Sequence, residues 1–226
     1  MRTLKYLRTF EVALDKAGLG PVAGVDEAGR GSCAGPITIA ACILPSHPIA
    51  ELAELTDSKK LTPLKRAQLY PLILRYALAS AIVHISAPEI DIRGIQNANT
   101  SGMRRAVAQL KLSPHYILTD ALRIEGFSAP SLPIIGGDSQ ARCIAAASVL
   151  AKYARDTVME EYHEKYPVYN FARHKGYGTR EHIHAVRLHG ASPIHRYSYA
   201  NIAAAHKQWL AQENFPHQRE EQIDER

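Results

Sequence analysis

Short apolar runs that end in acidic residues occur at three separate places along this chain. The acids that follow them are Asp26 with Glu27, then Asp120, and then Asp138. Runs of this length are typical of buried strands, and a sheet that brings their ends together would gather four carboxylates. Adjacent side chains on a strand point to opposite faces, so Asp26 and Glu27 can face one point only if the strand ends there.

The rest of the pattern predicts further strands and several helices. Strands are expected at residues 22–25, 37–44, 78–85 and 115–120. The first two are expected to be antiparallel neighbours because the loop between them is short. Helices are expected at 3–17, from 62 to a break near Pro71, in pieces across 86–112 interrupted around Gly94 and Gly102, and at 140–165, 179–190 and 200–211. Asp138 or Ser139 would cap the helix over 140–165. This order of elements predicts an α/β fold, a sheet covered by helices.

Length and composition favour one domain. The chain has 226 residues, of which 46% are hydrophobic, and this is enough for a sizeable core. Residues 1–211 are expected to form a single domain and residues 212–226 a charged tail that frays. No exposed apolar helix face stands out, so a monomer is expected.

Cysteine use and apolar content indicate the compartment. Cys33, Cys42 and Cys143 are odd in number and lack CxxC spacing, which predicts reduced thiols in a cytoplasmic protein. The N-terminus lacks the continuous apolar region of a signal peptide, and no apolar run approaches membrane-spanning length. No membrane association is therefore predicted.

The charged residues suggest a phosphate-containing partner. Lys and Arg number 27 against 22 Asp and Glu, a formal charge of +5 that is compatible with binding a polyanion. Four carboxylates gathered at one point would repel one another, and Mg²⁺ or Mn²⁺ would relieve that repulsion. Two such ions about 4 Å apart can promote hydrolysis of a phosphodiester. The cations in loops that could hold phosphates are Arg30, Lys59, Lys60 and Lys175.

Other interpretations of these residues stay open on spacing alone. An Asp after a strand is common as a turn residue or a helix cap. The acids could therefore serve structure only, in a basic module that binds RNA or DNA without cutting it. His182 and His184, with His174 and His189 nearby, could suggest zinc, but scattered histidines on a helical surface are favoured because no cysteine or acid completes a site. Asp156 is expected to pair along its own helix.

The segment from Asp26 to Gly31, within VAGVDEAGRGSCAGP, resembles the opening motif of type 2 ribonuclease H, bacterial ribonuclease HII. Further blocks resemble that family in the same order. They are Leu55–Leu61, Gly137-Asp138, Ile144–Ser148, Ala151-Lys152, Arg155-Asp156, His174–Thr179 and His195-Arg196. The resemblance covers roughly residues 20–200.

The resemblance implies a ribonuclease H-like fold, with a mixed central sheet flanked by helices and a helical C-terminal part. It implies hydrolysis of the RNA strand of RNA–DNA hybrids and nicking of duplex DNA on the 5′ side of embedded ribonucleotides, leaving 3′-hydroxyl and 5′-phosphate ends. The implied ligands of two Mg²⁺ or Mn²⁺ ions, which also form the catalytic set, are Asp26, Glu27, Asp120 and Asp138.

The same resemblance implies a substrate-binding set. The Gly29-Arg30-Gly31 turn would recognise the ribose 2′-hydroxyl, the group that distinguishes RNA from DNA. Tyr177 would press against the neighbouring sugar, and Lys59 and Lys60 would contact phosphates.

Two features depart from the family pattern. Ala121 follows the third acid where the family more often has Gly, and Tyr197-Ser198-Tyr199 replaces the more usual basic-Ser-Phe after His195-Arg196. The leader is too short for the extra substrate-binding domain of the ribonuclease HIII type. The tail shows no convincing sliding-clamp peptide, so no such partner is predicted.

Overall fold

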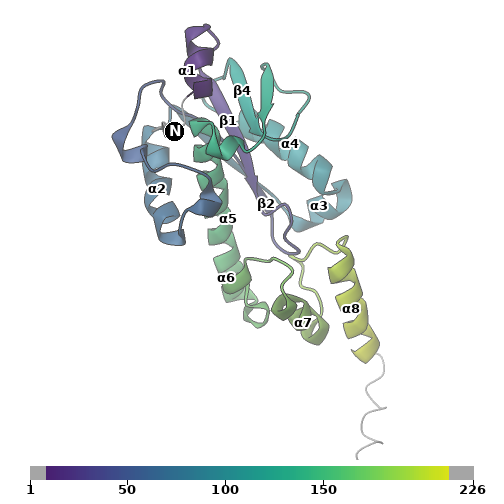
Figure 1. The fold of residues 1–226 in the computed structure, drawn as a ribbon. Helices are drawn as coiled ribbons and strands as arrows, with labels where there is room; N and C mark the ends of the chain where they lie inside the picture. Colours follow the sequence, from purple (N-terminus) through teal and green to yellow (C-terminus); the bar gives the residue numbers. More distant parts are fainter. Residues whose placement is uncertain (1–8, 214–226) are drawn as a thin grey trace, which may run out of the picture. The chain divides into compact units, whose positions relative to one another are not determined.

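The computed structural model describes residues 9–213. The helix expected over 3–17 is present as α1, Thr9–Lys16, and Ala17 lies in the turn that follows it. Residues 3–8 of that expectation and the tail beyond Glu213 lie outside the described residues. The strands are β1 Val22–Ala28, β2 Ile37–Ile43, β3 Ala79–Ile85, β4 Tyr116–Asp120 and β5 Ser131–Ile134. The other α-helices are α2 Pro63–Tyr76, α3 Ala87–Arg93, α4 Ile95–Ala108, α5 Arg142–Lys165, α6 Phe171–His174, α7 Arg180–His189 and α8 Ala200–Glu213. Figure 1 shows these elements in chain order.

The described chain divides into two compact units. The first unit comprises residues 9–30, 36–85 and 95–157. The second comprises residues 31–35, 86–94 and 158–213.

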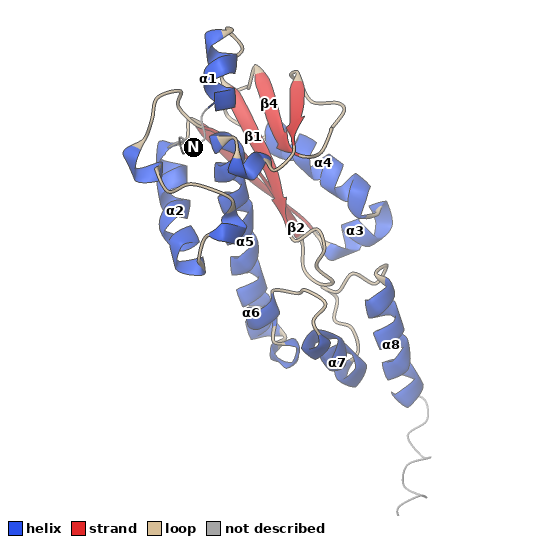
Figure 2. Ribbon diagram, in the orientation of Figure 1, coloured by secondary structure: helices blue, strands red, loops and turns tan. Residues whose placement is uncertain are grey.

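The first unit contains one mixed five-stranded sheet in the order β3-β2-β1-β4-β5 (Figure 2). β1 pairs antiparallel with β2, as the short loop predicts, and parallel with β4. The mixed sheet with its flanking helices confirms the predicted fold class. Because β1 and β4 run in the same direction, their C-terminal ends lie at the same edge of the sheet.

The two faces of β1 are covered by different helices. Gly24 lies against the start of α5, so closely that a Cβ there would overlap the backbone of Cys143 and Ile144. On the opposite face, Gly102 of α4 lies against Ile39 of β2. The glycine at position 24 and the alanine-rich start of α5 therefore allow a helix to approach the central strand closely.

Several predicted element boundaries were wrong. α2 continues through Pro71 to Tyr76, because Leu69 and Ile73 are buried on its inner face and this packing outweighs one missing backbone hydrogen bond. α4 is likewise uninterrupted at Gly102, which is buried against the sheet, whereas the break at Gly94 is confirmed.

The N-terminal end of α5 also differs from the prediction. A 3₁₀ turn, Gly137–Ser139, precedes the helix, which begins only at Arg142, so neither Asp138 nor Ser139 is its cap. The amide of Ala141 donates to the carbonyl of Gly137 at 2.7 Å and closes this turn. As a result, Asp138 lies inside a tight turn at the sheet edge.

The second unit is helical apart from one isolated bridge, between Ala34 and His195. Its core contains Phe171, Tyr169 and Val186, with α7 packed against α8. Thr179 caps α7 by accepting a hydrogen bond from the amide of His182, as the sequence predicts.

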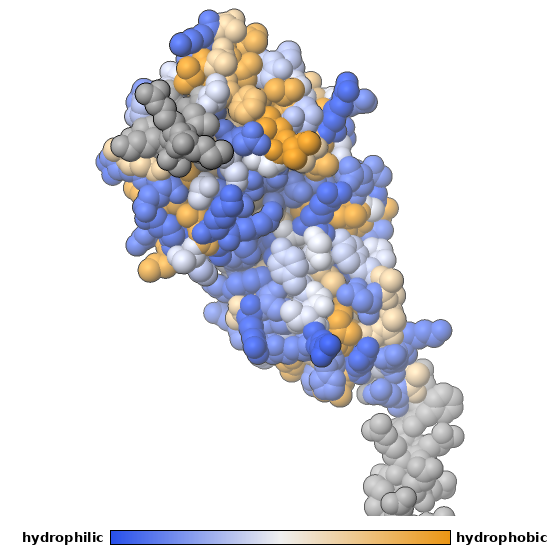
Figure 3. Space-filling model, in the orientation of Figure 1, coloured by the Kyte–Doolittle hydropathy of each residue, from blue (hydrophilic) through white to orange (hydrophobic). Residues whose placement is uncertain are grey.

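The surface view shows mainly hydrophilic residues on the face in view, with apolar residues gathered over α1 and the edge strand β5 (Figure 3). Leu132 and Ile135, at β5 and just after it, are among the exposed apolar side chains. Across residues 9–213, no helix is both long enough and apolar enough to cross a bilayer.

Candidate active site

Strand β1 carries its two acids to opposite faces of the sheet. The strand was expected to end at the acids, but it continues to Ala28. Asp26 pairs with Ala40 on the face covered by α5, and Glu27 pairs with Ile39 on the face covered by α4. The two neighbouring carboxylates therefore have different surroundings.

Three of the four predicted acids come together. Oxygen atoms of Asp26, Asp120 and Asp138 all lie within 4.8 Å of one another. Parallel pairing of β1 with β4 brings the first two to the same edge, and the turn before α5 adds the third. The amide of Gly137 donates to Oδ1 of Asp120 at 2.8 Å and ties this turn to β4.

The site makes the charged form of these acids costly. Burial raises the pKa of Asp26 well above its usual value, and the charges of Glu27 and Asp120 raise it further. Burial, followed by the charges of Asp120 and Asp57, raises the pKa of Asp138 to about 6. A divalent cation with oxygen ligands would offset both the burial and the repulsion, so these residues fit Mg²⁺ or Mn²⁺.

Glu27 is not a member of the group of three. One of its carboxylate oxygens, Oε2, is buried with no hydrogen-bond partner within the described part of the chain. Burial raises the pKa of Glu27, while the charge of Arg30 and the neighbouring Asn99 lower it and the charge of Asp120 raises it. Glu27 therefore interacts electrostatically with the group and retains an oxygen that a cation could use.

Two of the three predicted lysines, Lys59 and Lys60, lie in a short 3₁₀ helix, Ser58–Lys60, and Lys59 interacts with the acids. Burial lowers the pKa of Lys59, but the charges of Asp26, Asp57, Asp138 and Asp120 raise it, and the net shift is upward. Nζ of Lys60 donates to Oγ of Ser139 at 2.9 Å. Lys59 thus balances part of the negative charge of the site.

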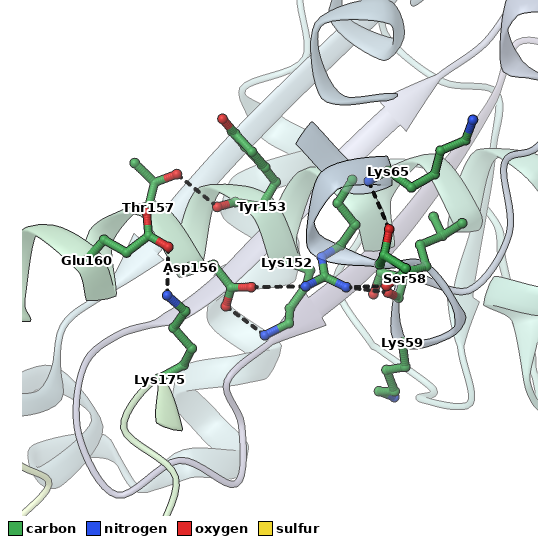
Figure 4. A network of polar contacts seen from close by, with 12 residues as sticks. Ser58, Lys59, Lys65, Lys152, Tyr153, Asp156, Thr157, Glu160 and Lys175 are labelled. Atoms are coloured by element: carbon green, nitrogen blue, oxygen red, sulfur yellow. Dashed lines mark hydrogen bonds and ion pairs between the residues drawn. The ribbon is translucent and has the colours of Figure 1, made fainter. Parts of the chain in front are cut away.

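A polar network attaches this lysine segment to α5 (Figure 4). Arg66 donates to the carbonyls of Ser58 and Leu61, at 3.0 and 2.6 Å, and lies 3.5 Å from the carboxylate of Asp156. Lys152 lies 2.6 Å from the other oxygen of Asp156, which confirms that this acid pairs along its own helix. The network fixes the backbone that carries Lys59.

The glycine-arginine turn contains two glycines of different kinds. Gly29 has φ +87°, and a Cβ there would overlap the side chain of Arg155, which is fully buried and donates to the carbonyl of Pro36 at 3.0 Å. Gly31 has open space where a Cβ would be, and its φ is outside the left-handed region. The fold therefore requires glycine at 29 but not at 31.

Arg30 extends from the same turn. Its Nη2 donates to Oε1 of Gln96, at the start of α4, at a distance of 2.6 Å. Its charge also lowers the pKa of Glu27. The arginine is thus held over the α4 side of the sheet.

The remaining predicted site residues belong to the second unit. Lys175 has φ +50°, and its Nζ lies 2.7 Å from Oε1 of Glu160, a pair visible in Figure 4. Tyr177 is 42% exposed, on the loop between α6 and α7. These two residues have contrasting settings, one in an ion pair and one with an exposed ring.

The histidine prediction was wrong for His182, which is fully buried rather than on a helical surface. Its ring lies in an aromatic cluster with His174 and His195. Within residues 9–213, Asp26, Asp120 and Asp138 are the only group of three or more potential metal ligands.

The departures from the family pattern have structural counterparts. Ala121 has φ +55°, a conformation that suits glycine better and explains why glycine would be favoured after Asp120. Asp91 accepts hydrogen bonds from the amides of Tyr197 and Ser198 at 2.9 and 3.0 Å. The hydroxyl of Tyr199 accepts one from Arg196.

Sequence reasoning missed three neighbours of the acids and one neighbour of Arg30. Ser148, which lowers the pKa of Asp26 through a hydrogen bond, is the polar residue in the alanine-rich part of α5, and this was a usable signal. Asp57 raises the pKa of Asp138 through its charge and a hydrogen bond, and it comes two residues before Lys59 in the chain. The other two, Asn99 and Gln96, lie on α4 without any sequence signal.

Comparison with known proteins decides the family. The family model for ribonuclease HII matches residues 23–202. The chain belongs to the ribonuclease HII family. A ribonuclease HII from Corynebacterium diphtheriae is 67% identical over 210 residues, which are 93% of this chain and 92% of that protein.

Solved structures with low sequence identity share the fold. A ribonuclease H2 from Pyrococcus horikoshii OT3 matches with a TM-score of 0.71 and 24% identity, over 84% of this chain and 98% of that one. Bst-RNase HIII, solved in complex with Mn²⁺, matches with a TM-score of 0.66 and 21% identity, over 88% and 74%.

Membership of the ribonuclease HII family makes the chain a nuclease with ribonuclease H activity on RNA–DNA hybrids, in a family that uses divalent metal ions. This outcome favours the enzyme over the module that binds nucleic acid without cutting it. Nucleic acid is thus the substrate class.

Proposed function

We propose that this enzyme also nicks duplex DNA on the 5′ side of an embedded ribonucleotide, as part of ribonucleotide removal. The observation that carries the proposal is the group of three carboxylates within 4.8 Å of one another, one of which, Asp26, comes three residues before the Gly29-Arg30-Gly31 turn in the chain. In this hydrolysis a water oxygen forms a bond to phosphorus and the bond from phosphorus to the 3′-oxygen breaks. The products are a 3′-hydroxyl and a 5′-phosphate.

The proposed catalytic and metal-binding residues are Asp26, Glu27, Asp120 and Asp138. Two divalent cations, Mg²⁺ or Mn²⁺, would supply an activated water and stabilise the leaving oxygen. The carboxylates supply hard oxygen ligands for these ions, and Ser148 orients Asp26. Burial and mutual repulsion of the acids favour cation binding over the ion-free state.

Recognition is assigned to a second set of residues. Gly29, Arg30 and Gly31 are proposed to recognise the 2′-hydroxyl, and the unhindered Gly31 supports this because a substrate can approach its backbone closely. Tyr177 is proposed to press against the neighbouring sugar, for which its exposed ring is suited. The lysines proposed to contact phosphates are Lys59, Lys60 and Lys175.

We also propose that residues 1–211 act as one catalytic domain, in a cytoplasmic monomer without a sliding-clamp contact through its tail. The family match over residues 23–202 includes sequence from both units, which supports one functional domain. Cys33, Cys42 and Cys143 are all buried free thiols, in keeping with a reducing compartment. The mainly hydrophilic face in Figure 3 supports a monomer.

The deciding assay uses a DNA duplex with one ribonucleotide, labelled at the 5′ end and incubated with Mg²⁺ or Mn²⁺. We expect one product, cut on the 5′ side of the ribonucleotide and ending in a 3′-hydroxyl. The same duplex without the ribonucleotide and a long RNA–DNA hybrid are the controls. If the hybrid is cut while the single-ribonucleotide duplex stays intact under both ions, the nicking proposal is wrong.

The Asp120→Asn variant tests the assignment of the acids in the same assay. We expect loss of cleavage on both substrates, with hybrid binding retained, because one oxygen ligand and one charge are lost while the side chain keeps its size. Undiminished cleavage would remove Asp120 from the catalytic set.

A further inference from the structure

Three buried histidines form a cluster in the second unit, away from any role in the proposed chemistry. His182 and His195 are 0% and 1% exposed, and His174 is 8% exposed. Their rings lie against Phe171 and, for His195, against Tyr169, with centroids 4.8 to 5.9 Å apart. An apolar aromatic setting of this kind favours the neutral form of each imidazole.

Hydrogen bonds to the backbone determine which nitrogen of each ring carries the proton. Nδ1 of His182 lies 2.9 Å from the carbonyl oxygen of Tyr177, and since a carbonyl only accepts, Nδ1 is the donor. In a neutral ring, Nε2 of His182 must then accept. Nε2 of His195, at 2.9 Å, is the donor to it.

The hydrogen bonds of His195 at its other ring nitrogen, Nδ1, agree with Nε2 being the donor. The amide of Ser192 donates to Nδ1 of His195 at 2.9 Å. The carbonyl of Ser192 lies farther from Nδ1, at 3.3 Å, and already accepts from the amide of His195 at 2.9 Å, so we assign Nδ1 as the acceptor and the proton to Nε2. The bonds therefore run from Ser192 through His195 and His182 to Tyr177. If both nitrogens of His182 carried protons, its Nε2–H would face the Nε2–H of His195, and the hydrogen bond between the two rings would be lost.

His174 adds a second pair of bonds with one consistent direction. The amide of Gly176 donates to its Nδ1 at 3.2 Å, and its Nε2 donates to the carbonyl of Tyr169 at 2.7 Å. Its ring stacks on that of His182, with centroids 4.5 Å apart and planes 17° apart. Two stacked rings at this distance favour the neutral form in both, because two positive charges would repel.

These bonds converge on the loop that carries Tyr177. The carbonyl of Tyr177 accepts from both His182 and the amide of Thr179, and its own amide donates to the carbonyl of His174 at 2.9 Å. Lys175 and Gly176 just before it have φ +50° and +80°. The backbone at Tyr177 is thus held on both sides, while the residue as a whole is 42% exposed.

We propose that His182, oriented by His195, is a positioning residue for Tyr177 and thereby sets the preference for single embedded ribonucleotides over long hybrids. A side chain that presses against a substrate sugar is effective only when its backbone is already in place, because each ångström of misplacement lowers transition-state complementarity. This inference rests on the proposed role of Tyr177.

Two substitutions at position 182 separate positioning from general damage. The amide nitrogen of Asn can occupy the place of Nδ1 and still donate to the carbonyl of Tyr177, whereas that of Gln lies nearer to Nε2 and cannot. Both variants leave a similar void and lose the ring. The measurement is the ratio of kcat/KM on a single-ribonucleotide duplex to kcat/KM on a long hybrid.

We expect His182→Gln to lower this ratio roughly tenfold, the change that follows from losing about one buried hydrogen bond in the transition state, and His182→Asn to keep most of it. Tyr177→Ala is measured in parallel, and its ratio should fall at least as far. Equal ratios for the Asn and Gln variants would overturn the positioning role.

The Tyr177→Ala result separates the two proposals. If it leaves the ratio unchanged, the proposed role of Tyr177 is wrong. If it lowers the ratio while His182→Gln does not, Tyr177 keeps its role and the positioning proposal fails.

A spectroscopic measurement tests the proton order without any substrate. In ¹⁵N-histidine-labelled protein, two-bond proton–nitrogen spectra should show the Nδ1–H form for His182 and the Nε2–H form for His195 and His174. The opposite form at His182, or a charged ring at neutral pH, would overturn the proposal. Spectra of variants in which one histidine at a time is replaced assign each signal to its residue.

Discussion

Replacing Asp120 by Asn should stabilise the metal-free protein while removing its function. The substitution removes the charge of one of three carboxylates whose oxygens lie within 4.8 Å of one another. Asn keeps an oxygen that can accept the 2.8 Å hydrogen bond from the amide of Gly137, so the local structure should persist. What changes is therefore the repulsion between Asp120 and the other acids, less the attraction between Asp120 and Lys59.

The size of the effect follows from that separation. Two unit charges at this distance repel by about 1 kcal/mol in a water-like surrounding and by about 3 kcal/mol at the lower effective dielectric of a protein site. The free energy of unfolding of the metal-free variant should therefore rise by roughly 1 to 3 kcal/mol, and each kcal/mol raises Tm by about 2 to 4 °C in a chain of this size.

Calorimetry at mildly alkaline pH measures both halves of the prediction. In EDTA, the Tm of Asp120→Asn should exceed that of the wild type. Addition of Mn²⁺ or Mg²⁺ should raise the Tm of the wild type more than that of the variant, because a ligand that binds only the folded state stabilises it. Asp15→Asn, with the same charge change at an exposed position on α1, is the control. It should change neither the Tm in EDTA nor the rise in Tm on addition of metal ions.

The reasoning fails if the folded variant is less stable than the wild type in EDTA. It also fails if metal ions raise the Tm of both proteins equally. The first result would mean that Asp120 stabilises the fold through its charge, and the second that it does not take part in binding the ions.

Two further predictions concern the turn and the buried histidines. Gly31→Ala should fold with unchanged Tm but lose at least about tenfold in kcat/KM on single-ribonucleotide duplexes, whereas Gly29→Ala should lower Tm, because its Cβ would overlap Arg155 and its φ is +87°. Full activity of a well-folded Gly31→Ala would contradict a close approach of substrate there. Burial lowers the pKa of His182 to about 4 and that of His195 to about 3, while unfolded histidine titrates near 6.5. Below pH 6.5 these histidines bind protons in the unfolded chain but stay neutral in the folded protein. Each of them therefore lowers the free energy of unfolding by about 1.4 kcal/mol for every pH unit between 6.5 and its folded pKa. Urea denaturation at neutral and mildly acidic pH should show a shallower fall for His195→Gln than for the wild type, and equal slopes would refute the assignment.

The order of strands and helices was readable from the chain because periodicity and apolar runs act locally. The short loop after β1 predicted its antiparallel partner, and the helix that Thr179 caps was found from its first residue. Local signals were less reliable where packing competes with them, as at Pro71, where the helix continues because its inner face is buried. Chain patterning thus identified elements better than it identified their ends.

For the candidate site, sequence alone indicated acids at strand ends and, through the family resemblance, the nuclease. It could not determine which carboxylates meet. That depended on the parallel pairing of β1 with β4 and on a turn before α5, which together gather Asp26, Asp120 and Asp138 and leave Glu27 on the other face.

The tertiary structure also decided the setting of each group. Burial raises the pKa values of Asp26 and Asp138 and lowers those of His182 and His195, and burial depends on residues distant in the chain. Sequence by itself determined which chemical groups the protein possesses. Their separations, their protonation and their partners arise only when the sheet and helices pack, because electrostatic energies depend on distance and solvent exposure rather than on order along the chain.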